Sequence, residues 1–317
     1  MRSLRHLAVV VTATFLMTVV VMVACSAPEN QNGAQANTAP QAGTTDWKAV
    51  AQALGKEGSM QPGDVYKVSL PRSDLQVTVG GVQIKPALAL GSWVAFKKTG
   101  NDTMAMGDLV LTEDEVTPVM TKLQEGGVEQ TALHNHVLHE SPRVMYMHIH
   151  AAGDPVKIAK AIHDALALSK TPLTAPPAAP AGGDQDIGID TKQLDQTMGQ
   201  TGKVNGGVYQ YSIPRAEAVT DGGMEVPPSM GVAQAINFQP TGGGKAAITG
   251  DFVLTASEVN PVIKALRDNG IEVTALHSHM LTENPRLFFM HFWANDDAQK
   301  LAHGLRAALD KINIKKG

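Results

Sequence analysis

Three segments of the sequence occur twice, and the separation between the copies is constant. VYKVSLPR returns as VYQYSIPR, GDLVLTEDEVTPVMTKL as GDFVLTASEVNPVIKAL, and TALHNHVLHESPRVMYMHIH as TALHSHMLTENPRLFFMHFW. Each copy begins 143 residues after the first, as from Val65 to Val208, and 11 of the 20 positions in the longest pair are identical. A repeat of this length is a duplicated domain, since solenoid units span about 20–45 residues. The chain must therefore fold as two copies of one structure, which are able to pack as a pseudosymmetric pair.

The duplication sets the domain boundaries. We expect a first repeat domain over 46–169, a linker over 170–189 and a second repeat domain over 190–317. The linker is rich in Pro and Ala, a composition typical of semi-extended linkers. Residues 26–45 are rich in Ala, Asn, Gln, Thr and Pro and have no hydrophobic period, which indicates a disordered tether.

Each copy has the same order of expected elements. A short helix precedes extended segments, and a longer helix then begins at Thr112 or Thr255, where a Glu three residues later completes a capping-box pattern. Two strands follow, joined by a turn with the sequence Glu-x-Pro-Arg, and a last helix begins at Asp154-Pro155 in the first copy. This order lacks regular βαβ alternation, so it predicts the α+β class: two tandem homologous domains, each an antiparallel-rich sheet with two main helices.

The first 25 residues differ from the rest of the chain. Arg2 and Arg5 precede an apolar run from Leu7 to Ala24, a pattern typical of an export signal. The run ends at Cys25, the single cysteine, in a context that resembles the lipobox of bacterial lipoproteins, where the signal is removed and the thiol is lipidated. We therefore predict a lipoprotein signal peptide over 1–25, lipidation of Cys25, and an extracytoplasmic protein anchored through its lipid to the bacterial cell membrane or envelope. An uncleaved membrane anchor and a free thiol are the alternatives.

Composition excludes several classes of function. The net charge of −4 and the scattered Lys and Arg argue against nucleic acid as a partner, because a phosphate backbone requires a basic stripe. The sequence contains no GxGxxG, no P-loop and no Gly-x-Ser-x-Gly element. Lipidation of the single cysteine would also exclude disulfides and thiol catalysis.

Histidine is the residue type that suggests chemistry. Eight of the 11 histidines lie in two short windows, and three positions hold His in both copies: His134 and His277, His136 and His279, and His148 and His291. Residues two apart on a strand share a face, and an antiparallel return brings the third histidine of each copy back toward the first. Three imidazoles converging within each copy predict a site for a divalent metal, with zinc first and copper or iron as alternatives.

Two further pairs match between the copies near these histidines. Glu140 and Glu283 are candidates for a fourth ligand or for the general base of a metal-dependent hydrolase, so an enzymatic role stays open. Arg143 and Arg286 are candidates for binding an anionic ligand, although a salt bridge that fixes the turn is the favoured interpretation for Arg143. Two alternatives need no metal: a binding module for an unknown small molecule or envelope ligand such as a glycan or peptide, and a structural or partner-binding protein with histidines in its core.

Two resemblances bear on these predictions. His134-Asn-His136, followed after three residues by Glu140, is similar to the first cupin motif, but the second motif is absent and two capped helices per repeat do not suit a β-barrel. We interpret the spacing as convergent.

The whole chain more closely resembles the LppY/LpqO-type family of bacterial lipoproteins, through Cys25, the paired domains and the repeated TALHxHxLxExPRxxxMH stretch. That resemblance implies lipid anchoring and duplication, and it implies no established activity.

Overall fold

The computed structural model describes residues 45–100, 102–174 and 186–315. The predicted signal peptide, Cys25, nearly all of the predicted tether and part of the predicted linker lie outside the described residues. Residues 44–317, which include both repeats, form one compact unit. None of the helices in the described ranges is long and apolar enough to cross a membrane.

Each repeat contains a six-stranded antiparallel sheet, with strand orders β1-β2-β5-β6-β9-β7 and β10-β11-β14-β15-β18-β16. The first sheet consists of β1 (Ser59–Gln61), β2 (Val65–Pro71), β5 (Gly91–Thr99), β6 (Asp102–Thr112), β9 (Val144–Gly153) and β7 (Glu129–His134). The second consists of β10 (Lys203–Asn205), β11 (Val208–Pro214), β14 (Ala233–Gly242), β15 (Lys245–Leu254), β18 (Phe288–Asp297) and β16 (Glu272–His277). The two orders are the same, which confirms the predicted duplication and the α+β class.

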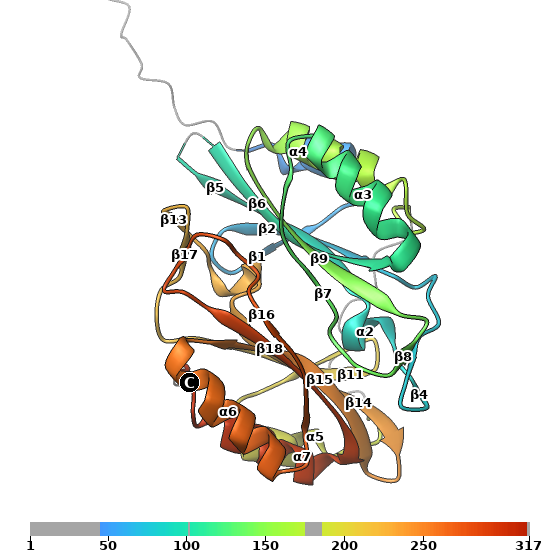
Figure 1. The fold of residues 1–317 in the computed structure, drawn as a ribbon, viewed down its shortest axis with the longest axis vertical. Helices are drawn as coiled ribbons and strands as arrows, with labels where there is room; N and C mark the ends of the chain where they lie inside the picture. The colour runs from blue at the N-terminus through green and yellow to red at the C-terminus, as the bar shows by residue number, and fades with distance from the viewer. Residues whose placement is uncertain (1–44, 101, 175–185, 316–317) are drawn as a thin grey trace, which may run out of the picture. The chain divides into compact units, whose positions relative to one another are not determined.

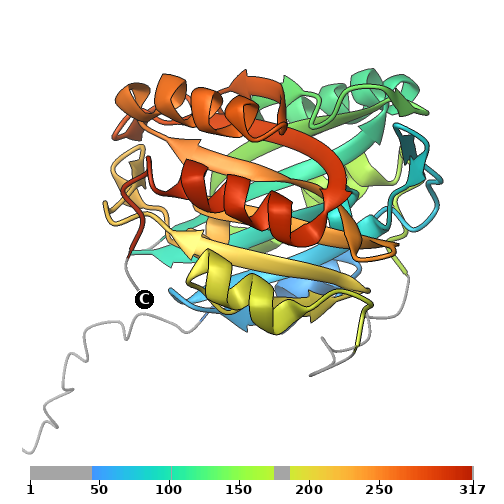
Figure 2. The ribbon, with the colours of Figure 1, turned by 90° about the horizontal axis from the view of Figure 1, so that it is seen from below.

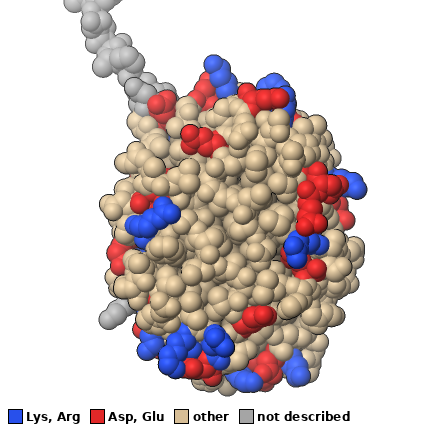
Figure 3. Space-filling model, in the orientation of Figure 1, with Lys and Arg blue, Asp and Glu red and all other residues tan. Residues whose placement is uncertain are grey.

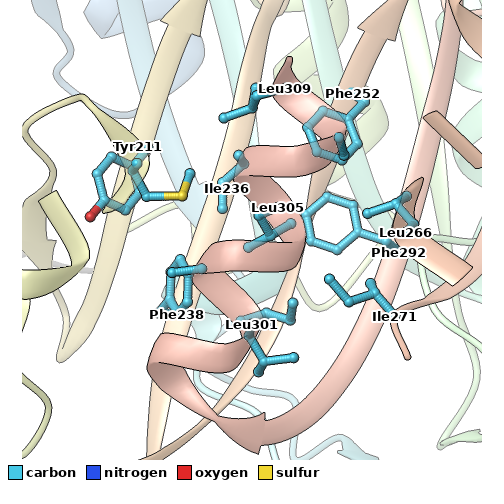
Figure 4. Packing of buried hydrophobic residues seen from close by; sticks show 14 of the residues in the cluster. Tyr211, Ile236, Phe238, Phe252, Leu266, Ile271, Phe292, Leu301, Leu305 and Leu309 are labelled. Carbon is cyan, nitrogen blue, oxygen red and sulfur yellow. The ribbon is translucent and has the colours of Figure 1, made fainter. Parts of the chain in front are cut away.

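Three helices cover one face of each sheet: α1 (Trp47–Leu54), α3 (Glu113–Glu125) and α4 (Pro155–Leu166) in the first repeat, and α5 (Thr191–Met198), α6 (Ala256–Asp268) and α7 (Ala298–Leu309) in the second. The predicted capping boxes are present at the starts of α3 and α6. Each helix places its apolar stripe on the sheet beneath it. In Figure 4, Leu305 and Leu309 of α7 lie against Phe292 and Phe252 of the second sheet, and Leu301 lies near Phe238.

The other faces of the two sheets pack against each other. Two buried clusters contain residues from both repeats: Met104 lies in one cluster with Phe289, and Tyr146 lies in the other with Val208. The resulting order of layers is helices, sheet, sheet, helices (Figures 1 and 2). Both faces of each sheet are therefore covered, which explains why β6 is buried along nearly its whole length.

Smaller elements connect the main strands. The segment LQVTVGGVQI contains a short hairpin of β3 (Thr78–Val79) and β4 (Val82–Gln83), which pairs with β8 (Glu140–Ser141). The second repeat has the same arrangement in β12 (Thr220–Asp221), β13 (Met224–Glu225) and β17 (Glu283–Asn284). The short helices α2 (Pro86–Ala89) and η1 (Pro228–Met230) complete the two repeats.

The repeated VYxxSxPR segment ends in an arginine that joins the sheet to a helix. Arg72 is fully buried, and its Nη1 donates to Oε2 of Glu115 and to the carbonyl of Val110, both at 2.7 Å. Oε2 of Glu115 also accepts from the backbone N–H of Thr112, which completes the capping box of α3. Arg215 and Glu258 repeat this arrangement in the second copy at the same 2.7 Å. Because buried charges require partners, each pair fixes the position of a helix on its sheet.

Candidate metal centre

The paired strands place two histidines of each copy on the inner face of its sheet, while His136 and His279 lie just beyond the strand ends and not, as predicted, on the strands themselves. β7 ends at His134, whose partner in the register is Tyr146, and His148 on β9 lies opposite Ala132. Strand alternation therefore directs Tyr146 and His148 toward the other repeat, while Met147 packs into the core beneath the helices. The predicted antiparallel return is confirmed. β16 and β18 place the second set of histidines in the same way.

The six matched histidines form one cluster where the two repeats meet. The three closest ring pairs between the repeats have centroid distances of 3.6 Å for His134 and His277, 3.9 Å for His136 and His291, and 3.6 Å for His148 and His279. If the two repeats are exchanged, the His136–His291 pair becomes the His148–His279 pair, and the His134–His277 pair is unchanged. The cluster therefore has the pseudo-twofold symmetry of a dimer contact. The sequence predicted a three-histidine site within each copy. The structure instead joins both triplets into a shared cluster, because the faces that carry them pack together.

The Nε2 atoms of all six histidines are buried, and none has a hydrogen-bond partner within the described part of the chain. The Nδ1 atoms of three of them face backbone carbonyl groups: His134 faces Asn135 at 3.2 Å, His277 faces Ser278 at 3.4 Å, and His291 faces Gly250 at 2.8 Å. A carbonyl oxygen can only accept, so these three Nδ1 atoms carry the proton. Their Nε2 atoms consequently present lone pairs, which is the form that binds a metal.

Burial also keeps these imidazoles neutral. It lowers the pKa of His134 to about 3 and that of His277 to about 4, and it lowers the pKa values of the other four well below the usual range. For most of the six, the neighbouring histidines lower the pKa further, because one protonated ring would repel another. Neutral imidazole is the ligand form that zinc, copper and iron take in proteins.

Two aspartates, Asp108 on β6 and Asp251 on β15, belong to the cluster and were not predicted. Asp108 lies 3.9 Å from Nε2 of His136 and 3.8 Å from Nε2 of His148, while Asp251 lies 3.8 and 3.9 Å from Nδ1 of His279 and His291. These distances are too long for hydrogen bonds. Burial raises the pKa of Asp108 to about 7, against the charge of Lys67, and burial and then Asp108 raise the pKa of Asp251 well above its usual range. Each follows a glycine in the Gly-Asp pair that both copies of a buried strand contain. This repeated acid is the sequence feature that could have indicated the two aspartates.

Four of the imidazoles are arranged closely enough for a single ion. The ligand nitrogens of His134, His277, His279 and His291 all lie within 4.8 Å of one another. Four nitrogens in a tetrahedral zinc site are about 3.4 Å apart, given Zn–N distances of about 2.0–2.1 Å. Side-chain rotations that move the nitrogens by about 1 Å would therefore bring all four onto one ion.

The glutamates of the Glu-x-Pro-Arg turns make their hydrogen bonds within the turns. Glu140 and Glu283 accept from the backbone N–H four residues later, at 3.3 and 3.1 Å, and Arg286 pairs with Glu283 at 3.2 Å. Among the described residues, neither glutamate hydrogen-bonds or ion-pairs with a histidine of the cluster. Arg143 is exposed. The proposed base and anion-binding roles of these four residues stay predictions, and their contacts are those of a turn that positions the strands.

The surface near the cluster has few charges. Beside the histidines, Leu133 and Leu276 are exposed at matching positions on the edge strands, as are Leu138 and Leu281 in the following turns. On the face that carries β7 and β16, Figure 3 shows charged side chains mainly toward the edges and uncharged atoms in the centre.

Comparison with known proteins gives a family but no activity. The model of the family described as Domain of Unknown Function (DUF1259) matches residues 48–168 and again 192–311. The chain belongs to this family. The two matches are the two repeats, so the family domain is the duplicated unit described above. No curated protein matches the chain.

Two solved structures show a weak likeness. A trimeric bacterial microcompartment shell protein, PduB, has 13% sequence identity, a TM-score of 0.19, and coverage of 80% of this chain and 90% of its own. EtuB from Clostridium kluyveri has 10% identity, the same TM-score of 0.19, and coverage of 80% and 88%. TM-scores this low carry no argument about function.

Proposed function

We propose that this protein binds a divalent transition metal in the histidine cluster shared by its two repeats. The observation that carries the proposal is the set of six buried Nε2 atoms with no donor to satisfy them. Each unsatisfied buried polar atom costs about 1–3 kcal/mol, so a partner that several of these atoms share would stabilise the fold. A cation accepts the lone pairs of several imidazoles at once and also balances the two nearby carboxylates. Zinc is our first choice because it takes four neutral nitrogen ligands, with copper or iron as alternatives.

Metal binding is favoured over a hydrolytic function. A zinc hydrolase keeps an open coordination position and places a base beside the bound water. Here four imidazoles are close enough to complete a tetrahedral shell, and Glu140 and Glu283 are engaged with their own turns. Binding, buffering or transfer of a metal ion is the role that this arrangement supports.

A cell-envelope location is part of the proposal. The basic flank, the apolar run and Cys25 support an LppY/LpqO-type lipoprotein held to the membrane by its lipid, with residues 26–45 as the tether. Incorporation of a labelled fatty acid that is lost in Cys25→Ser would support the anchor. Absence of label in the parent chain would contradict it.

The metal proposal is tested by elemental analysis of the untagged chain, since a polyhistidine tag would itself bind metal. We expect near-stoichiometric metal in the parent and none in a folded His134→Ala/His277→Ala variant. The matched control is His303→Ala, because His303 is an exposed histidine on α7. No metal in the parent after incubation with zinc, copper or iron would contradict the proposal and favour a metal-free pocket or a structural histidine network.

A further inference from the structure

The two halves of the cluster are related by the repeat, yet they differ in charge. On the first-repeat side, Lys67 lies on β2, and its ammonium sits 4.0 Å above the ring of Trp93. Trp93 is the register partner of Asp108 on the next strand, so the ammonium and this carboxylate share the inner face of the sheet. The ammonium also donates to the carbonyl of Ser229 at 3.1 Å, which holds it between the repeats.

The second-repeat side has no such cation. Gln210 occupies the position that matches Lys67, and its amide donates to the carbonyl of Ala87 at 2.8 Å. Ala235 replaces the aromatic ring as the register partner of Asp251. Among the described residues, no Lys or Arg forms an ion pair with Asp251, which faces the imidazoles of His279 and His291 at 3.8 and 3.9 Å. Asp251, whose side chain is 18% exposed, therefore has no cation on its side of the cluster like that of Lys67.

We propose that the cluster holds a single metal ion on the Asp251 side, and that the ammonium of Lys67 replaces a second ion on the Asp108 side. This inference rests on the metal binding proposed above. The four nitrogens that lie within 4.8 Å of one another support it, because three belong to the second repeat and the fourth is His134. An ammonium repels a divalent ion from the first-repeat side, while an unpaired carboxylate attracts one to the other side.

The ammonium of Lys67 also limits the number of ions. A second divalent ion would add its charge to that of the ammonium in a buried region of low dielectric. Buried charge without compensation is costly, so one ion is the favoured occupancy.

Exchange of the two matched residues, Lys67 and Gln210, tests the proposal. Metal content per chain is measured for the parent, for Lys67→Gln and for Gln210→Lys, each saturated with zinc and desalted, with folding checked by circular dichroism. We expect one ion in the parent, two in Lys67→Gln, and at least a tenfold weaker affinity in Gln210→Lys. One ion in both the parent and Lys67→Gln would overturn the role of Lys67, and two ions in the parent would overturn the single occupancy. No ion in any of the three would contradict the proposed function itself.

Matched histidine variants test the location even if an exchange variant fails to fold. Loss of a ligand reduces metal affinity by more than about 100-fold, since even the partners of ligands contribute 10- to 100-fold. We expect that loss in His291→Ala and a change below tenfold in His148→Ala. Equal losses in the two variants would overturn the assignment to the Asp251 side.

Discussion

The Asp108 side and the Asp251 side of the histidine cluster share a backbone and three matched imidazoles, and they differ in the residue on the second strand of each sheet. Lys67 places a cation on the same face of the sheet as Asp108, whereas Gln210 hydrogen-bonds the backbone of the other repeat and places no cation near Asp251. Around this difference the scaffold is repeated closely, including the buried arginine pairs and the capping boxes. A duplicated domain can thus keep its fold in both copies while a few substitutions, among them Lys67 for Gln210, make the shared site asymmetric.

The largest expected effect tests whether the two scaffolds are equivalent. Arg72→Ala and Arg215→Ala each leave a buried glutamate without its partner, so each should lower the free energy of unfolding by about 3–5 kcal/mol, measured by urea denaturation. Lys264→Ala, which breaks an exposed pair with Asp268, is the control and should cost less than about 1 kcal/mol. A cost below 1 kcal/mol for either arginine would show that its repeat does not depend on the buried pair.

Acid should destabilise the metal-free protein through both repeats. A histidine whose pKa in the folded state is below its unfolded value near 6.5 stabilises the fold fully above that pH, and this stabilisation is lost as the pH falls toward the folded value. For His134, with a folded pKa of about 3, and His277, at about 4, the expected joint loss between pH 7 and 5.5 is about 2.5 kcal/mol.

Urea denaturation in the presence of a chelator at the two pH values measures this loss. His134→Gln and His277→Gln should each reduce the pH dependence by a similar amount, because the two rings face each other as a matched pair. A pH-independent free energy of unfolding in the parent would contradict the buried neutral state of these imidazoles.

Substitution of the two matched glycines that precede Asp108 and Asp251 should lower the free energy of unfolding by unequal amounts. A Cβ on Gly250 would overlap the carbonyl oxygen of Ala235, while a Cβ on Gly107 would lie 2.8 Å from that of Trp93. Overpacking costs about 1–3 kcal/mol, so Gly250→Ala belongs near the upper end of this range and Gly107→Ala near the lower end. Gly250→Ala should also weaken metal binding, because the carbonyl of Gly250 orients His291. Thermal melts and zinc titrations of both variants check the order, and a reversed order would contradict the packing described.

The smallest effect concerns the ring beneath His136. Tyr146→Phe converts this position to the residue of the second repeat, Phe289, and removes the hydrogen bond to the carbonyl of Ala89 at 2.9 Å. We expect a loss of about 0.5–1.5 kcal/mol in unfolding free energy and no change in metal stoichiometry. A change in the number of bound ions would show that the hydroxyl, and not the charge of Lys67, distinguishes the two sides.

Much of the scaffold was predictable from local patterns. The constant repeat separation implied two copies of one structure, and Thr112 with Glu115 located the start of α3 because a capping box is a local interaction. Shorter elements such as α2 were missed, because four residues carry too little periodicity to be recognised.

The candidate site was predictable only in part, because it depends on tertiary contacts. The pattern of one repeat shows that His134 and His148 share a face, but it does not show which surface covers that face. That the two triplets of histidines form one cluster could therefore not be predicted from the sequence and is seen only in the structure. Asp108 and Asp251 were missed although an acid in both copies of a buried strand was a usable signal, and the difference between Lys67 and Gln210 acquires meaning only once Asp108 lies nearby.

Anomalous diffraction at the zinc edge, from crystals of the untagged protein grown with zinc, tests the central claim most directly. We predict one anomalous peak per chain, between His134, His277, His279 and His291 and on the side of Asp251. A peak on the side of Asp108, two peaks of equal height, or no peak within the histidine cluster would contradict this account.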